Sequence, residues 1–127
     1  MHEVAIAQRL VHLMRDAADG AGGGRVVSGR LLVGQLTCID PGCLAFGFEI
    51  AARGTVAAGA RLDIVPVPLR LRCRQCGVER GGELYEPCRC GAVAGEVLAG
   101  RELRLESIDV DDSGAPVLAS APAGERT

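Results

Sequence analysis

The chain has 127 residues, and its 14 basic and 16 acidic side chains give a formal charge of −2. This length allows one compact domain with a small appendage, and the interspersed charge offers no electrostatic footprint for nucleic acid or a membrane surface. No apolar run approaches the roughly 18–20 residues that span a bilayer, and no signal segment is recognisable at the start. We therefore expect a cytoplasmic protein, in which the six cysteines favour metal binding over disulfides.

A helix followed by a strand is predicted over the first part of the chain. Residues 3–19 carry apolar side chains at helical spacing, and the glycine-rich run 20–24 ends the helix. Residues 25–36 are rich in Val and Leu and predict a strand, with Gly29 and Gly34 as points of close approach or a bulge. The apolar helix positions are Val4, Ala7, Leu10, Val11, Met14, Ala17 and Ala18.

A second helix and a second strand follow. Asp40 and Pro41 predict the start of the helix, with Asp at the N-cap and Pro at the first helical position. This helix is expected to end near Gly54. Residues 60–67 predict a strand, and Pro66 places it at the edge of a sheet or at its own end.

The character of the chain changes at residues 69–98, which hold four cysteines and several glycines. Residues 102–110 again alternate as a strand, with a slip of the apolar phase near Ser107 that predicts a bulge. From residue 111 to 127, Ser, Gly, Ala and Pro dominate and predict a disordered tail.

Together these elements predict an α/β fold: a small three-stranded sheet packed with two helices, plus an inserted zinc-ribbon-like module. Residues 1–68 and 99–110 would form the main domain, and residues 69–98 would form the module.

Four cysteines in two short turns predict a structural zinc site. Cys73 and Cys76 are separated by two residues and followed by Gly77, while Cys88 and Cys90 are separated by one residue. Four thiolates on facing turns provide the tetrahedral ligand set of structural zinc. A module of about 30 residues buries too little apolar surface to fold alone, so metal binding would supply on the order of 10 kcal/mol.

Two other interpretations of these cysteines remain open: a pair of disulfides or four unconnected thiols, and a nucleic-acid-binding ribbon. The second is disfavoured because five arginines between 69 and 98 are opposed by four glutamates, and Tyr85 is the only aromatic residue there. Neither a phosphate track nor a platform for base stacking is evident.

The N-terminus offers donors for a different metal. The amine of Met1, the amide nitrogen of His2 and the His2 imidazole can chelate one ion, and Glu3 can complete the set with its amide or carboxylate. Nitrogen-rich, tetragonal coordination suits Ni(II) or Cu(II). A His at position 2 alone is weak evidence, and an ordinary exposed terminus is the alternative.

The remaining candidate residues have simpler interpretations. His12 is expected on the solvent-facing side of the first helix. Cys38 and Cys43 flank the start of the second helix and are expected to be buried or half-buried thiols. Asp40 is most simply a cap, with an auxiliary metal carboxylate as the alternative. No catalytic triad, paired-carboxylate site or phosphate loop is visible, so an enzyme is not predicted.

Several of these features occur together and resemble the HypA/HybF family of nickel-incorporation proteins over residues 1–110. They are Met1-His2-Glu3, Val33-Gly34-x-Leu36, Phe48-Glu49, Gly54-Thr55, Gly59-Ala60, the two cysteine turns, Gly100-x-Glu102-Leu103 and Ser107-Ile108. The combination is specific because the N-terminal motif and the cysteine module stand at the right separation.

The resemblance implies Ni(II) binding at His2 and Glu3 with the Met1 amine, and structural zinc at Cys73, Cys76, Cys88 and Cys90. It also implies delivery of nickel to nickel-iron hydrogenase or urease, with a nickel-handling GTPase and the hydrogenase large-subunit precursor as partners of a monomer or homodimer. The family usually shows two Cys-x2-Cys pairs, and here Pro87 takes the place of the third cysteine. The alternative function is a small zinc-ribbon interaction or regulatory module without nickel transfer.

Overall fold

The structure is a computed structural model that describes residues 3–93 and 95–111. Met1, His2 and the predicted tail beyond Asp111 lie outside the described residues. The elements follow one another as α1 (Glu3–Gly20), β1 (Arg25–Gly34), the 3₁₀ turn η1 (Gln35–Thr37), α2 (Pro41–Ala52), β2 (Arg61–Val67), β3 (Arg70–Cys73), β4 (Glu79–Arg80), β5 (Gly95–Ala99) and β6 (Leu103–Asp111).

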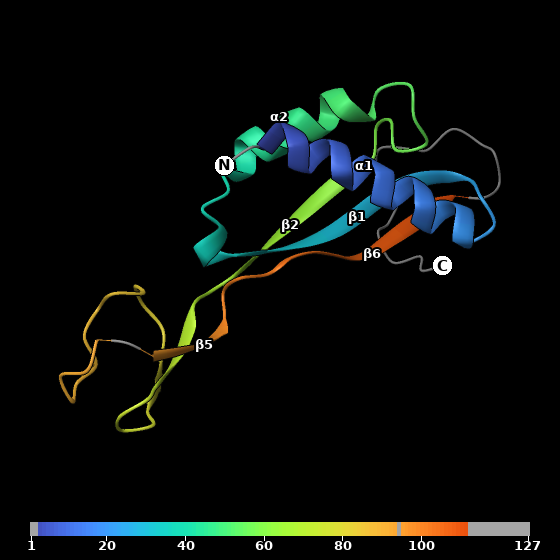
Figure 1. The fold of residues 1–127 in the computed structure, drawn as a ribbon. Coiled ribbons are helices and arrows are strands. Elements are labelled where there is room, and N and C mark those ends of the chain that lie inside the picture. Colours follow the sequence, from blue (N-terminus) through green and yellow to red (C-terminus); the bar gives the residue numbers. More distant parts are fainter. Residues whose placement is uncertain (1–2, 94, 112–127) are drawn as a thin grey trace. The chain divides into compact units, whose positions relative to one another are not determined.

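These strands form two three-stranded sheets, in the orders β2-β1-β6 and β4-β3-β5 (Figure 1). With the two helices, they confirm the predicted α/β fold with a small three-stranded sheet and a ribbon-like insert. The strand with Pro66, β2, lies at the edge of its sheet as predicted. None of the helices in the described ranges is long and apolar enough to cross a membrane.

Contacts within the chain define two units. Unit 1 comprises Met1–Leu31, Ile39–Ile64 and Leu105–Thr127, and unit 2 comprises Leu32–Cys38 and Val65–Arg104. Unit 1 contains both helices, and unit 2 contains the cysteine module. The assignment of one domain to nickel and the other to zinc stays a prediction.

In unit 1 the two helices pack against each other (Figure 1), and their buried faces form the core together with strand residues such as Leu31 and Ile108. The helix predicted at 3–19 is confirmed, and its inward face carries most of the residues expected there. Val4 and Ala17 are corrections, because both are exposed. The buried side chains of the two helices are Ala7, Leu10, Val11, Met14, Ala18, Leu44, Phe48 and Ala52.

The second helix begins where the sequence predicts. The Asp40 carboxylate accepts hydrogen bonds from the N–H groups of Gly42, at 2.9 Å, and Cys43, at 3.1 Å. These bonds satisfy two of the free donors at the helix start, so the N-cap is confirmed. The helix ends at Ala52, just before Gly54, whose φ of 75° few other residues adopt.

The slip of phase predicted in the last strand is visible in its contacts with β1. A Cβ built on Gly29 would lie 3.4 Å from Leu105 and 3.8 Å from Ile108. Residues three apart in a regular strand point to opposite faces, so these two share a face only if the alternation slips between them.

The strand predicted over 25–36 ends earlier, at Gly34. A Cβ at Gly34 would lie 2.1 Å from the carbonyl oxygen of Gly100, so only glycine allows this close approach. The N–H of Leu36 donates to the same carbonyl at 2.8 Å, and the Thr37 hydroxyl donates to the Gly34 carbonyl at 2.8 Å. The chain therefore turns at Gln35 instead of continuing the ladder.

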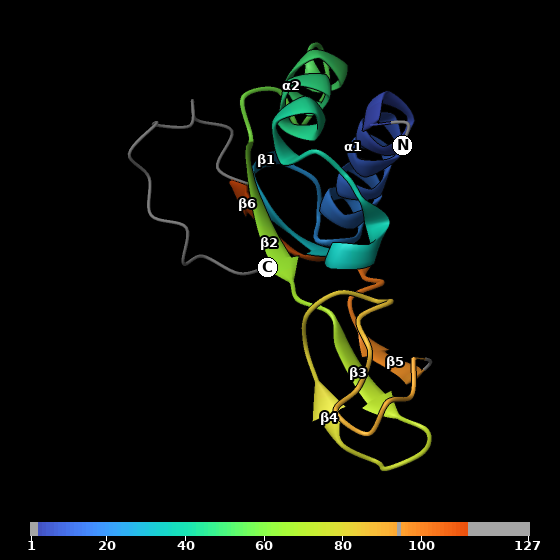
Figure 2. The same cartoon turned by 90° about the vertical axis from the view of Figure 1, so that its left-hand side faces the viewer.

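Unit 2 is organised around β3, which pairs antiparallel with β4 on one side and β5 on the other (Figure 2). Leu69 and Leu71 are its most deeply buried apolar side chains. The side chain of Gln35 accepts a hydrogen bond from the Leu69 N–H at 2.9 Å and donates to the Gly82 carbonyl at 3.1 Å. Gln35 thus links η1 to the residues just before β3 and just after β4.

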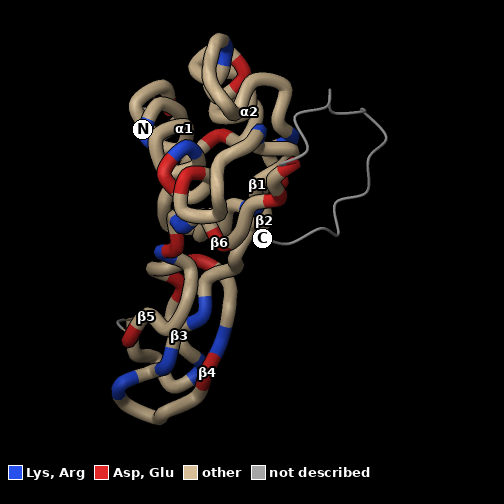
Figure 3. Tube along the Cα trace, turned by 90° about the vertical axis from the view of Figure 1, so that its right-hand side faces the viewer, with Lys and Arg blue, Asp and Glu red and all other residues tan. Residues whose placement is uncertain are grey.

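Basic and acidic residues are intermixed along the strands of unit 2 (Figure 3). Arg72 on the central strand lies 3.1 Å from Glu79 and 3.7 Å from Glu96, one on each neighbouring strand. All three side chains are about half exposed, so these pairs contribute little to stability. Such alternation is the opposite of a continuous phosphate-binding track.

Candidate metal centres

Four cysteine sulfurs gather at one end of unit 2. The sulfurs of Cys73, Cys76, Cys88 and Cys90 all lie within 4.8 Å of one another. Cys73 and Cys88 are buried, whereas Cys76 and Cys90 are exposed. The structure thus brings together the whole set that the sequence predicts, including the pair that follows Pro87.

Each pair is held by a tight turn that closes on a glycine. The N–H of Gly77 donates to the Cys73 carbonyl at 2.9 Å, and the N–H of Gly91 donates to the Cys88 carbonyl at 2.8 Å. Both glycines have positive φ, at 79° and 94°. The N–H groups of Gln75 and Cys76 point at the Cys73 sulfur, each at 3.4 Å. The turns therefore present backbone donors that favour a thiolate.

The distances between the sulfurs fit a tetrahedral metal site better than disulfides. The sulfurs of Cys73 and Cys90 are 3.6 Å apart, as are those of Cys76 and Cys88. A disulfide needs about 2.05 Å, whereas four thiolates about 2.3 Å from a central zinc lie roughly 3.8 Å from one another. All six cysteines are free thiols. The cluster therefore fits a structural zinc site.

The thiols of the cluster differ in acidity. The N–H groups of Cys76 and Gln75 lower the pKa of the Cys73 thiol to about 6. At Cys76, the Val78 N–H also lowers the pKa, but the Cys88 sulfur, desolvation and the remaining sulfurs outweigh it and raise the pKa to about 11. A metal ion deprotonates its thiol ligands outright, so zinc would remove this inequality.

At the other candidate site, Glu3 lies beside the start of α2. Its carboxylate accepts a hydrogen bond of 3.1 Å from the backbone N–H of Asp40. This bond, followed by the N–H of Glu3 itself, lowers the pKa of the Glu3 carboxyl group. The hydrogen bond from Asp40 therefore fixes the position of the Glu3 carboxylate and favours its charged form. Met1 and His2 lie outside the described residues.

The expectation of buried or half-buried thiols at Cys38 and Cys43 is wrong, since both are exposed. Cys38 ends the 3₁₀ turn in the left-handed conformation, with a φ of 56°. Cys43 lies in the first turn of α2, where the Asp40 carboxylate, desolvation and Glu3 raise the pKa of its thiol. His12 is exposed, as predicted.

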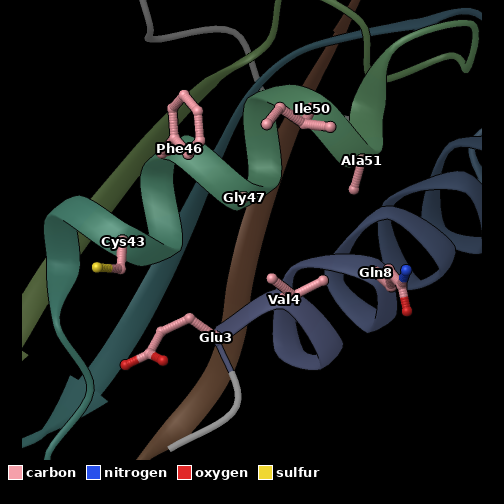
Figure 4. A pocket seen from close by; sticks show the side chains of 8 residues that line it. All are labelled: Glu3, Val4, Gln8, Cys43, Phe46, Gly47, Ile50 and Ala51. Atoms are coloured by element: carbon pink, nitrogen blue, oxygen red, sulfur yellow. The ribbon is translucent and has the colours of Figure 1, made fainter.

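A groove of about 570 Å³ runs between α1 and α2 and begins at Glu3 (Figure 4). Its floor is Gly47, where a Cβ would lie 3.5 Å from the Cβ of Ala7 and 3.8 Å from the Cα of Val4. The missing side chain lets the two helices approach closely at this point. The groove is lined by Glu3, Val4, Gln8, Cys43, Phe46, Gly47, Ile50 and Ala51.

Sequence reasoning missed this groove and the role of Gln35. An apolar position at helical spacing is normally assigned to the core, so Val4 gave no separate signal. Gln35 is an ordinary polar residue near the end of a strand, and its contacts with Leu69 and Gly82 depend on tertiary structure.

Comparisons with known proteins extend over nearly the whole described chain. A family model described as "HypA: Hydrogenase/urease nickel incorporation, metallochaperone" matches residues 1–110. A relative named hydrogenase maturation factor HypA from Trichormus variabilis is 38% identical and covers 88% of this chain and 97% of its own length. A relative of the same name from Geobacter metallireducens is 39% identical, with 87% and 100% covered.

Two solved structures share the fold. A solution structure of HypA protein has a TM-score of 0.66 at 23% identity, and the match covers 87% of this chain and 97% of that chain. A solution structure of the Ni metallochaperone HypA from Helicobacter pylori has a TM-score of 0.63 at 22% identity, with the same coverage. These likenesses support the architecture of helices, sheet and cysteine module described above.

Proposed function

Because the chain belongs to the HypA family of hydrogenase/urease nickel-incorporation metallochaperones, we propose that it binds Ni(II) at its N-terminus and delivers the ion during maturation of nickel-iron hydrogenase. The family match over residues 1–110 carries this proposal, since it includes both the N-terminal motif and the cysteine module. The names of the relatives favour hydrogenase as the client, with urease as the second candidate. The alternative of a zinc-ribbon module without nickel transfer is not favoured.

The proposed nickel donors are the Met1 amine, the His2 amide nitrogen and imidazole, and Glu3. The hydrogen bond from Asp40 to the Glu3 carboxylate supports this arrangement, because it holds the start of α1 beside α2. Asp40 is the proposed auxiliary carboxylate. Its Oδ1 already accepts two N–H groups of α2, so the nickel would take the other oxygen or none.

Zinc is the proposed resident metal, held by Cys73, Cys76, Cys88 and Cys90. The clustered sulfurs and the backbone donors around Cys73 support a closed thiolate site. A site with four protein ligands has no open position for substrate, so zinc would serve the fold and not catalysis.

We propose that the protein acts without turnover, as a carrier in the cytoplasm. A nickel-handling maturation GTPase and the hydrogenase large-subunit precursor are the proposed partners. In this scheme the chelate at the chain end takes up nickel, and transfer proceeds by ligand exchange.

Adding residues before Met1 tests the nickel site. With an uncleaved Gly-Ser before Met1, the terminal amine becomes a peptide nitrogen, which is not a free donor at neutral pH. We expect calorimetric nickel titration to show markedly weaker binding than in the native chain, although His2 and Glu3 remain. Equal affinities would mean coordination by side chains alone.

A second variant tests whether nickel binding belongs to this end of the chain. His2→Ala is expected to abolish specific nickel binding without changing zinc content or thermal stability, because Ala offers no donor in place of the imidazole. If the His2→Ala chain still bound one nickel with unchanged affinity, the assignment of the nickel site to the N-terminus would be overturned.

A further inference from the structure

The cysteine cluster has a pairing that a structural zinc site does not by itself require. Two sulfur pairs join the first cysteine turn to the second: Cys73 lies 3.6 Å from Cys90, and Cys76 lies 3.6 Å from Cys88. In the first pair Cys73 is buried and Cys90 is exposed, and in the second Cys88 is buried and Cys76 is exposed. Each pair therefore combines one cysteine that solvent reaches with one that it does not.

We propose that the cluster is also an oxidation site, in which a hydroperoxide oxidises Cys90 at the surface, Cys73 forms a disulfide with it, and the module releases its zinc. The disulfide joins the two turns and not two residues of one turn. This inference rests on the resident zinc of the proposed function and adds a reversible way in which the module can lose it.

Exposure and hydrogen bonding single out Cys90 as the sulfur that reacts first. Hydroperoxides oxidise the thiolates that they can reach, which favours the two exposed cysteines. Donors reduce the nucleophilicity of a thiolate, and the Cys73 sulfur accepts the N–H groups of Gln75 and Cys76 at 3.4 Å. The Val78 N–H acts in the same way on Cys76. In the part of the chain that the structure describes, the Cys90 sulfur contacts Cys73 and has no backbone donor.

The reaction needs one hydroperoxide and two sulfurs. The Cys90 thiolate attacks an oxygen of the hydroperoxide, an S–O bond forms, the O–O bond breaks, and the departing oxygen takes up a proton and leaves as an alcohol or water. The Cys73 thiolate then attacks the Cys90 sulfur, the S–S bond forms, the S–O bond breaks, and the departing hydroxide takes up a second proton. The two sulfurs together lose two electrons, and the hydroperoxide gains them.

The geometry allows this bond and explains the loss of zinc. The two sulfurs need to approach from 3.6 Å to about 2.05 Å, which is a small movement for exposed and half-exposed turns. The bond removes two of the four thiolates that a structural zinc site requires. Cys76 and Cys88 are also 3.6 Å apart and can form a second disulfide with a second hydroperoxide.

A disulfide at this place fits a site that responds to oxidants. In a reducing compartment, protein disulfides are rare and are usually transient, catalytic or redox-sensing. Both proposed disulfides join the same two turns that zinc would join. The oxidised module would therefore stay cross-linked without its metal, and thiol exchange would restore the four ligands.

The sequence makes the disulfide pairing directly measurable. Trypsin cleaves after arginine, and the arginines at 72, 74, 80, 89 and 101 place each cysteine of the cluster in a separate peptide. Zinc-loaded wild-type protein is treated with limiting hydrogen peroxide, and its free thiols are then blocked by alkylation. Mass spectrometry of the digest identifies the joined peptides, while a zinc-sensitive dye records the released metal.

We expect the first disulfide to join Cys73 and Cys90 and to form in step with the release of one zinc per chain. Dithiothreitol with added zinc should reverse both changes. The double variant Cys38→Ser/Cys43→Ser is the matched control, because it removes the two exposed thiols that lie outside the cluster. It should give the same disulfide and the same zinc release as the wild-type chain.

Any other first product would overturn the inference: a disulfide within one turn, a disulfide between Cys76 and Cys88, or zinc release without a disulfide. Zinc that stays bound while the four thiols remain unmodified would overturn it as well. In each of these cases the zinc and nickel sites of the proposed function would stand. Protein that contains no zinc before the treatment would instead remove the proposed zinc site, and this inference with it.

Discussion

The two units of this chain are stabilised in different ways. In unit 1, the buried positions are apolar side chains from both helices and the sheet, among them Met14, Leu31 and Leu44. In unit 2, the buried set includes Leu69 and Leu71 together with the thiols of Cys73 and Cys88. A core in which sulfur takes the place of hydrocarbon needs a metal to hold it, so packing stabilises unit 1 and coordination stabilises unit 2.

The same contrast applies to the two proposed metals. The proposed zinc ligands are built into turns and partly buried, so release of the ion would require the fold to open. The proposed nickel donors stand at the end of the chain, where an ion can leave without disturbing the core. A carrier protein needs this division, because its cargo must exchange while its structure persists.

The largest effect is expected from Cys73→Ser, which should unfold unit 2 and leave unit 1 folded. Cys73→Ser removes a proposed zinc ligand that is buried and accepts two backbone hydrogen bonds. Because metal binding supplies on the order of 10 kcal/mol to such modules, we expect loss of zinc and unfolding of β3, β4 and β5. Hydrogen exchange should show these strands unprotected while α1 and α2 keep their protection.

Cys38→Ser is the matched control, since Cys38 is exposed and lies outside the sulfur cluster. It should retain one zinc per chain and the full protection pattern. If Cys73→Ser exposed the amides of both helices as well, the two units would unfold together, and the contrast drawn above would be wrong.

How much of this the sequence could predict depends on the range of the interactions. Asp40 was identifiable as a cap because its partners, Gly42 and Cys43, follow within the next turn. The four clustered cysteines were identifiable because their short spacings form a local pattern that is typical of metal sites. The order of the two helices and of the strands β1, β2 and β6 followed from periodicity in the same way, whereas the short strands β3, β4 and β5 of the cysteine module were not predicted.

The misassigned residues depend on contacts between distant segments. Val4 has the right spacing for a core residue, but it lines the groove between α1 and α2 and is exposed. Cys38 and Cys43 are small and apolar in character, yet the turn and the helix start on which they lie face solvent. The bonds from Gln35 to Leu69 and Gly82 likewise required the folded chain.

A smaller effect is expected from Gln35→Ala, which tests how much hydrogen bonding, apart from the metal, stabilises unit 2. Gln35→Ala removes the side-chain acceptor of the Leu69 N–H and so breaks a part-buried hydrogen bond. An intramolecular hydrogen bond contributes about 0.5–1.5 kcal/mol, so we expect unit 2 to lose stability while zinc stays bound. Chelator-induced unfolding should begin at a lower chelator concentration than in wild type.

Gln75→Ala is the control for this variant, because the side chain of Gln75 is exposed on the first cysteine turn and only its backbone N–H contacts the cluster. It should behave like wild type. Equal chelator sensitivity of the Gln35→Ala chain would show that coordination alone determines the stability of unit 2.

The smallest effect concerns Asp40, where a cap and a proposed nickel carboxylate coincide. Asp40→Ala removes the acceptor for the N–H groups of Gly42 and Cys43 and should destabilise unit 1 by about 1 kcal/mol, whereas Asp40→Asn keeps a capping oxygen and should restore most of that loss. Neither change removes the Asp40 N–H that holds Glu3, since that donor belongs to the backbone. Thermal unfolding and nickel titration of both variants therefore separate the two roles. If Asp40 only caps the helix, Asp40→Asn binds nickel like wild type. If the carboxylate is also a ligand, Asp40→Asn recovers the stability but not the nickel affinity, and the nickel site then includes a residue of α2 as well as the chain end.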